Sequence, residues 1–222
     1  MNLAICVSGK YDPVFEDRGT KKILEDYFGG KVFTGTWDTD TENEGKVDHL
    51  FAVPNMHYHP GVEHESTPPP AYNQFVKNGK AAQENWKWRT LQILIHAGMM
   101  FCVPPSYDMI IRTRFDVRID TSLDVRNFLS QSYEENIPVG FQTPKFRPET
   151  ISKLDVLKKG HNRENQYLPD HLIMHRRKSF DPFYVNEMHL TKNLLPAEYG
   201  WYQSLCVYDD DHISILGFAG VK

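Results

Sequence analysis

The stretch YDMIIRTRFDVRID, residues 107–120, carries charged side chains at every second position of its second half. It first places three apolar residues in a row over 109–111, as expected for a buried strand, and the charges that follow at every second position are Arg112, Arg114, Asp116, Arg118 and Asp120. In an extended chain alternate side chains point to the same face, so the sequence predicts that these charges share one face. Because an unpaired buried charge is costly, such a strand end needs water, mutual pairing or a ligand.

Two interpretations of this charged strand end are open. In the first, the end of the strand emerges into solvent and its arginines and aspartates pair with each other. In the second, the guanidinium groups bind phosphate through parallel hydrogen bonds, and a carboxylate binds a divalent cation that bridges the phosphates. In open α/β sheets ligands bind beyond the carboxyl ends of the strands, which is where this stretch becomes polar. The second interpretation therefore predicts a site for a metal diphosphate.

The composition argues against several classes of protein. The 222 residues include 25 Lys plus Arg and 29 Asp plus Glu, for a net charge of -4, and no segment is basic enough to hold a nucleic acid by its phosphates. Cys6, Cys102 and Cys206 form no C-x-x-C pair, which predicts buried, reduced thiols. No apolar run approaches the roughly 20 residues of a membrane helix, and no signal peptide is recognisable. We expect a soluble, cytoplasmic protein.

The opening of the chain follows a strand, helix, strand order. Residues 3–9 are a continuous apolar run that ends in a Ser-Gly turn, the pattern of a strand covered on both faces. Residues 16–28 have mixed helical spacing and are followed by two glycines, and residues 31–36 are typical of a second strand. This order predicts an α/β fold, residues 1–222 forming a single domain with a mostly parallel central sheet flanked by helices.

The rest of the chain alternates between irregular and periodic segments. Residues 38–78 are rich in proline, histidine and acidic residues and show no period, which predicts a long irregular excursion. Residues 80–100 place apolar side chains at spacings of three and four, which predicts a helix packed by one face. The remaining expected elements are helices over 122–132 and 197–207, strands over 137–142 and 212–218, and a short strand or helix start over 171–175.

Several segments together resemble one family of enzymes. YDMIIRTRFD resembles the YD-x-x-I-R-x-R-x-D signature of bacterial and large-virus glycosyltransferases of the GT-A fold, which are related to lipopolysaccharide and capsule synthesis proteins. The first strand and turn of these enzymes resemble LAICVSGK, and the helix before the signature resembles QENWKWRTLQILIHAG. Their acceptor-side Asp segment resembles NQYLPDHLIMHRR, and a late Glu-containing helix resembles LLPAEYGWYQSL. The resemblance implies a Rossmann-like GT-A domain that moves a sugar from a nucleotide-sugar donor to a glycan or other hydroxyl acceptor, as in polysaccharide biosynthesis.

The resemblance also implies roles for residues on the donor side. GT-A enzymes usually carry an Asp-x-Asp motif whose carboxylates hold Mn²⁺ or Mg²⁺ on the donor diphosphate. Asp116 takes the final position of this motif and becomes the expected metal ligand, whereas Arg114 stands in the first position. A single carboxylate can still hold Mg²⁺ together with diphosphate oxygens and waters. Alternatively, Arg112 or Arg114 partly replaces the metal as the counter-charge of the phosphates. The turn after the first strand is expected beside the base and ribose of the donor through Ser8, Gly9 and Lys10.

Two carboxylates are candidates on the acceptor side. If the enzyme inverts the anomeric centre, a carboxylate must take the proton of the acceptor hydroxyl. Asp170 is the first candidate for this catalytic base and Glu198 the second. If the enzyme retains configuration, Asp170 only orients the acceptor. An ordinary helix N-cap at Asp170 is the structural alternative.

Two further functions stay open. Judged by residue type, the best set of possible metal ligands is His57, His59 and His64. Such a set would suit a metal-dependent hydrolase. No H-E-x-x-H motif frames them, so a solvated loop is the simpler interpretation. The other possibility is a non-catalytic nucleotide- or glycan-binding module in which Arg112 and Arg114 hold a ligand without turnover. No G-x-G-x-x-G or G-K-[ST] loop occurs, which argues against dinucleotide enzymes and P-loop NTPases.

Overall fold

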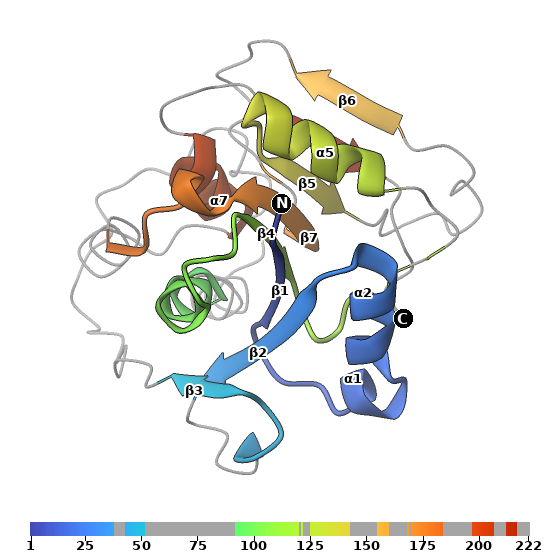
Figure 1. The fold of residues 1–222 in the computed structure, drawn as a ribbon, viewed down its shortest axis with the longest axis vertical. Coiled ribbons are helices and arrows are strands. Elements are labelled where there is room, and N and C mark those ends of the chain that lie inside the picture. Colours follow the sequence, from blue (N-terminus) through green and yellow to red (C-terminus); the bar gives the residue numbers. More distant parts are fainter. Residues whose placement is uncertain are drawn as a thin grey trace, which may run out of the picture.

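The chain folds as an α/β structure (Figure 1). Its one sheet has eight strands in the order β3-β2-β1-β4-β7-β5-β8-β6. The structure is a computed structural model, and the residues that it describes are 1–37, 43–51, 92–119, 121, 125–142, 155–159, 168, 170–183, 197–206 and 212–216. Within this part of the chain, no helix is long and apolar enough to cross a bilayer.

The first half of the sheet is entirely parallel. Its strands are β1 (Leu3–Ser8), β2 (Lys31–Trp37), β3 (His49–Phe51) and β4 (Met109–Thr113). β1 is central in this half, because Ile5 lies opposite both Val32 in β2 and Ile111 in β4. Every residue of β1 is buried, which explains why its sequence is apolar without alternation.

The second half of the sheet contains the strands that run in the opposite direction. Its strands are β5 (Val139–Gln142), β6 (Asp155–Lys159), β7 (Leu172–Arg176) and β8 (His212–Leu216). β7 is antiparallel to both β4 and β5, β8 is parallel to β5, and β6 is antiparallel to β8 at the edge. Only β6 and β7 oppose the other strands, so the predicted mostly parallel α/β sheet is confirmed. The assignment of one domain stays a prediction.

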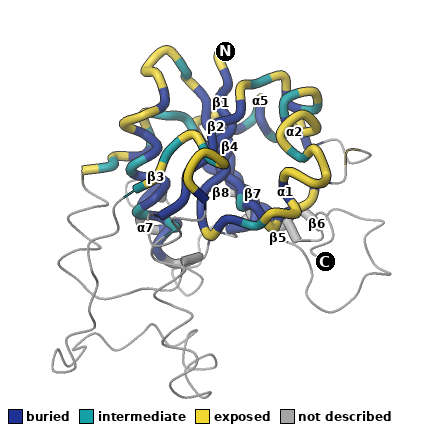
Figure 2. Tube along the Cα trace, turned by 90° about the horizontal axis from the view of Figure 1, so that it is seen from below, coloured by how far each residue is buried: buried dark blue, intermediate teal, exposed yellow. Residues whose placement is uncertain are grey.

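Helices pack on both faces of the sheet. One face is covered by α1 (Val14–Asp17), α2 (Thr20–Phe28) and α5 (Arg126–Glu135), which contribute Phe15, Leu24 and Leu129 to a core with β1 and β4. The other face is covered by the helix over 92–102 and by α7 (Ala197–Cys206), which supply Ile93, Met99 and Trp201. The strands β1, β2 and β4 are therefore dark blue between yellow surface segments in Figure 2.

The predicted elements differ from the observed ones mainly at their ends. The helix expected over 16–28 is two helices, because Gly19 takes a left-handed conformation (φ 63°) between α1 and α2. The helix expected over 80–100 is described from 92 and continues to 102, and α5 starts later than residue 122. β3 interrupts the excursion predicted over 38–78, of which 38–42 and 52–78 lie outside the described residues. β6 was not predicted.

The described cysteines are free thiols, as predicted, but only one is buried. Cys6 is fully buried in β1, and burial raises the pKa of its thiol to about 12. Cys102 is exposed at the end of the helix over 92–102, so the prediction of burial is wrong there. This helix ends at the surface, and its last residues leave the apolar layer.

A pair of histidines lies in the core beside α7. The Nε2 atoms of His96 and His175 are 3.2 Å apart, and Nδ1 of His175 is 2.8 Å from the carbonyl oxygen of Arg176. Because only an N–H can bond to that carbonyl, His175 donates through Nδ1 and accepts through Nε2 from His96. Burial lowers the pKa of His96 well below its ordinary value and that of His175 to about 4. Both rings are therefore neutral at pH 7.

This histidine pair predicts a loss of stability in acid. In the unfolded chain the two rings bind protons near pH 6.5, whereas in the folded protein they resist protonation, so the unfolded state binds more protons below pH 6.5. We expect the free energy of unfolding to fall as the pH drops from about 6.5 to about 4, by on the order of 3 kcal/mol for His175. Urea midpoints at several pH values measure this. The double variant His96→Met/His175→Met should be less pH-dependent, and an unchanged dependence would contradict the assignment.

Candidate functional site

The predicted phosphate-binding residues lie at the carboxyl ends of β1 and β4. Ser8 is the last residue of β1, and Arg112 lies in β4 next to the end of that strand. Arg114 and Asp116 lie in the turn that follows. Since β1 and β4 are parallel neighbours, all four residues lie at the same edge of the sheet.

Asp170 reaches this edge from the antiparallel strand. It precedes β7, whose first residue Leu172 lies opposite Thr113, the last residue of β4. The hydroxyl of Thr113 donates to the carbonyl oxygen of His171 at 2.9 Å, which fixes the start of β7 against the end of β4. The acceptor-side residue predicted from the sequence therefore lies in the same cluster as the arginines.

The prediction that five charges share one extended face is wrong. β4 ends at Thr113, and the chain then turns, with the N–H of Val117 donating to the carbonyl oxygen of Arg114 at 3.3 Å. Alternation persists in the burial of Phe115, Val117 and Ile119, but Arg112 is wholly buried and does not share a surface with Asp116. Asp120 lies outside the described residues. Arg112 can be buried because the interior supplies enough acceptors for its guanidinium group.

Arg112 connects four segments of the fold through that guanidinium group. Nη1 donates to the carbonyl oxygen of Asp170, Nη2 to Oε1 of Gln92 at 2.5 Å, and Nε to Oγ of Ser8 at 3.4 Å. Cζ lies 4.9 Å from the centre of the Trp201 ring. Burial lowers the pKa of Arg112 to about 10, although the charge of Asp170 opposes this, so Arg112 is charged at pH 7. Its contacts position other residues of the site.

Arg114 links the two carboxylates of the cluster. Nε of Arg114 donates to Oδ1 of Asp116 at 2.8 Å, Nη2 contacts Oδ2 of Asp116, and Nη1 is 3.5 Å from Oδ2 of Asp170. The Asp116 side chain is 39% exposed and that of Asp170 only 4%, so the row of charges leads from solvent into the protein. Burial by itself would raise the pKa of Asp116, but the hydrogen bonds and charge of Arg114 outweigh it and the pKa is lowered.

The turn after β1 lies beside this cluster and depends on a glycine. Gly9 has φ 133°, a conformation that side-chain-bearing residues rarely adopt, and its N–H donates to the carbonyl oxygen of Gly35 at 3.3 Å. A Cβ at this position would lie 3.6 Å from Cγ of Gln92. Lys10 follows and is exposed. The turn thus offers backbone and one cation at the edge where the arginines lie.

Gln92 is a residue of the site that the sequence did not single out. Its side chain accepts a hydrogen bond from Arg112 and packs beside the turn after β1. Its only sequence signal is a polar side chain inside an apolar helical pattern. Trp201 and Tyr202 in α7 are core residues. Glu198 lies in α7, but its side chain is outside the described residues, as are all of His57, His59 and His64.

No protein-family model matches this sequence, and no curated protein matches it significantly. Among solved structures, the chain is similar to a glycosyltransferase involved in the glycosylation of the major capsid of PBCV-1, with a TM-score of 0.46 and 11% identity over 97% of this chain and 81% of that chain. It is also similar to 4-diphosphocytidyl-2C-methyl-D-erythritol synthase from Anaerococcus prevotii, with a TM-score of 0.49 and 9% identity over 98% of this chain and 89% of that chain.

The carboxylates of the cluster do not fit a divalent cation as they are placed. Among the described residues, no group of three or more His, Cys, Asp and Glu side chains is arranged to hold a metal ion. Asp116 and Asp170 are both within reach of Arg114, whose guanidinium group lies where a cation shared by them would bind. The Mg²⁺ or Mn²⁺ site expected at Asp116 would require Arg114 to move away, because two cations at one place repel each other.

Proposed function

We propose that this protein is a glycosyltransferase that moves a sugar from a nucleotide-sugar donor to a glycan or other hydroxyl acceptor. The observation that carries the proposal is the cluster of Arg114, Asp116 and Asp170 at the carboxyl edge of the parallel strands, beside the turn after β1. Ligands of open α/β sheets bind at this edge. The same residues carry the sequence resemblance to GT-A glycosyltransferases.

The donor diphosphate binds between Lys10 and Arg114. Nε and Nη2 of Arg114 hold Asp116, and Nη1 lies 3.5 Å from Oδ2 of Asp170, which is a longer contact. A phosphate oxygen competes well for this nitrogen, because a charge-assisted hydrogen bond to phosphate is short and strong. Asp116 keeps the guanidinium plane fixed. As the sugar leaves, negative charge grows on the diphosphate and a cation already in place stabilises it.

Donor binding also prepares the acceptor side. When Nη1 of Arg114 turns to the diphosphate, the carboxylate of Asp170 loses that contact and can accept a proton. The acceptor oxygen attacks the anomeric carbon, its proton passes to Asp170, and the bond from the sugar to the diphosphate breaks. This transfer inverts the anomeric centre. Arg112 holds the backbone of Asp170 through its carbonyl oxygen and so positions the base.

A thermal-shift screen tests donor binding and the role of the arginine together. UDP-, GDP-, CDP- and dTDP-sugars are added with EDTA and, separately, with Mn²⁺, because a ligand that binds only the folded state raises the melting temperature. We expect at least one donor to raise it in EDTA. Lys10→Ala should reduce the shift, whereas Lys22→Ala, which removes an exposed lysine on α2, should not. No shift with any donor in either buffer would overturn the proposal.

Turnover of that donor then separates an enzyme from a binding module. We expect slow release of free nucleotide, and EDTA should lower the rate by less than about twofold, since Arg114 supplies the counter-charge. A donor that binds without any release of nucleotide indicates a binding module. A rate lost in EDTA and restored by Mn²⁺ would show instead that Asp116 binds a metal and that Arg114 moves.

A further inference from the structure

A pocket of about 510 Å³ lies at the opposite edge of the sheet from the candidate site. Its lining includes Asp108, which directly precedes β4, and Arg176, the last residue of β7, which lies opposite Met109. The candidate site lies at the other ends of the same two strands. The volume is in the range of small-ligand sites, so this pocket is large enough for a ligand of its own.

Two arginines hold the walls of this pocket together. Arg176 donates to the carbonyl oxygens of Tyr133 and Glu134 at the end of α5, and its guanidinium lies 4.7 Å over the ring of Tyr133. Arg177 donates to the carbonyl oxygens of Pro104 at 3.2 Å and of Met100 and Val103, at the end of the helix over 92–102. Each arginine thus caps a helix C-terminus, and the helix dipoles offset part of their charge.

The ammonium group of Lys178 is a third positive charge at the pocket, and it does not hold other described parts of the fold in place. It is exposed and lines the pocket, and in the described part of the chain it has no hydrogen bond or ion pair. The lining contains three basic residues and one acidic residue, Asp108, which accepts a hydrogen bond from the N–H of Asn2 at 3.1 Å. The pocket therefore favours an anion, and a lysine ammonium is a common partner of phosphate.

Two exposed phenylalanines flank the same pocket. Phe101 is 53% exposed and Phe183 is 72% exposed, and each directly follows a residue of the lining, Met100 or Pro182. Their ring centres are 5.0 Å apart in an edge-to-face contact. The N–H of Phe183 donates to Oδ1 of Asp181 at 2.9 Å, which fixes the backbone there. Paired aromatic rings that stay exposed beside a charged pocket mark a surface that binds an amphiphilic partner.

We propose that this edge binds the surface of a bilayer that contains anionic phospholipid. A lipid phosphate occupies the pocket beside Lys178, and the rings of Phe101 and Phe183 enter the boundary between headgroups and acyl chains. Basic pockets bind lipid headgroups, and phenylalanine side chains of proteins bound at a membrane surface enter this boundary. A second copy of the chain fits less well, because a two-fold contact would bring equivalent cations together. A free phosphate ester would leave both rings in water.

Vesicle co-sedimentation of the full chain tests this proposal. We compare vesicles of phosphatidylcholine alone with an equimolar mixture of phosphatidylcholine and phosphatidylglycerol, and expect binding to the mixture only. Phe101→Ser and Phe183→Ser should each weaken binding by about tenfold, as expected for one buried ring. Lys178→Glu should weaken it by about fivefold. The controls Ile23→Ser and Lys22→Glu change an exposed apolar and an exposed basic residue of α2 and should bind as the parent protein does.

Three outcomes would overturn the proposal. The first is equal binding to both vesicles, or no binding to either. The second is tight binding of glycerol 1-phosphate in the absence of vesicles, if Lys178→Glu abolishes this binding and both phenylalanine variants keep it. That result would make the pocket a site for a free phosphate ester. The third is a concentration-dependent dimer that Phe183→Ser dissociates, since this would make the surface a contact between copies. The substituted residues are exposed, so melting temperatures should stay close to that of the parent.

Discussion

Asp170→Asn is expected to lower the turnover number by about 10²- to 10⁴-fold, the range that general base catalysis supplies. Asparagine has nearly the same shape but cannot take the proton of the acceptor hydroxyl. Arg112 binds the carbonyl oxygen of residue 170, which the substitution keeps, and the side chain is largely buried. The variant should therefore fold and still show a donor-induced thermal shift. Initial rates over a range of acceptor concentrations separate the turnover number from the Michaelis constant.

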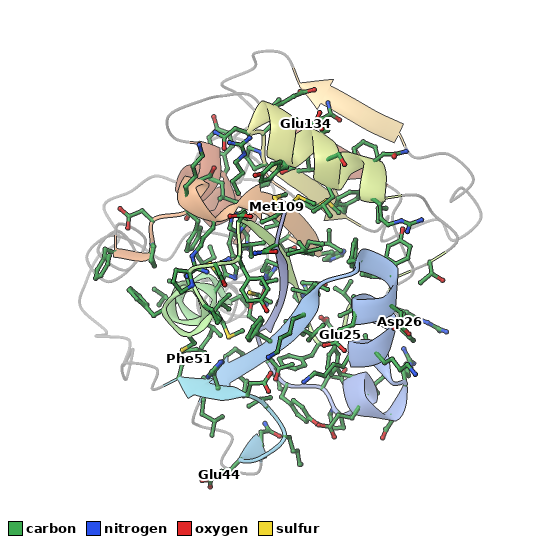
Figure 3. All side chains as sticks on the ribbon, in the orientation of Figure 1. Glu25, Asp26, Glu44, Phe51, Met109 and Glu134 are labelled. Atoms are coloured by element: carbon green, nitrogen blue, oxygen red, sulfur yellow. The ribbon has the colours of Figure 1, made fainter. Side chains whose placement is uncertain are left out.

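A matched control for this variant is Asp26→Asn. Asp26 is exposed on α2 and points away from the sheet (Figure 3). The activity of Asp26→Asn should therefore stay within about twofold of that of the parent, because the change lies on the surface away from the site. If Asp170→Asn keeps most of the turnover, Asp170 is not the base. If the loss appears in donor binding instead of in turnover, Asp170 serves only to hold Arg114 in place.

Arg112→Met is expected to lower the free energy of unfolding by about 3–5 kcal/mol, as when one member of a buried charged network is removed. The substitution leaves the carbonyl oxygens of Ser8 and Asp170 and the side chain of Gln92 without the donor that they share in the interior. Methionine fills much of the volume, so the loss reports mainly these unpaired acceptors. Urea unfolding, with the midpoint and slope compared with those of the parent, measures the change.

Two companion variants make this result specific. Arg118→Met removes an exposed arginine of the same stretch and should change the free energy of unfolding by less than about 0.5 kcal/mol. Arg112→Lys keeps the charge but loses the planar fork, so it should fall between the parent and Arg112→Met and should also lower turnover, because the backbone of Asp170 is less well held. A change below about 1 kcal/mol in Arg112→Met would contradict the role of this residue as a structural hub.

The sequence predicted the parts of the fold that depend on local pattern. β1, β2, β7 and α7 follow from apolar runs and helical spacing, and their observed ends lie close to the predicted ones. β3 is only three residues long and β6 carries a charge at each end, so neither gives a strong apolar signal. The alternation after residue 112 was visible, but the turn after Thr113 depends on how the chain packs against its neighbours.

The candidate site was predictable in its residue types and less so in its contacts. Arg114 and Asp116 pair because they are two residues apart, which the sequence shows directly. The contact of Arg114 with Asp170 requires β7 to run antiparallel to β4 in one register, and the contact of Arg112 with Gln92 requires a helix packed on the end of β1. Such pairings between distant segments follow from tertiary packing and have no signature in a single sequence.

The antiparallel course of β7 also sets the distance between the edge proposed for sugar transfer and the edge proposed to bind lipid. This strand leads from Asp170 at one edge to Lys178 near the other, and its five residues span about 17 Å of extended chain. A molecule seated on a bilayer through the phenylalanine side would hold its reactive edge above the headgroups, facing the aqueous phase. Acceptors would then be dissolved molecules or the outer ends of long anchored chains, and short glycolipids would be out of reach.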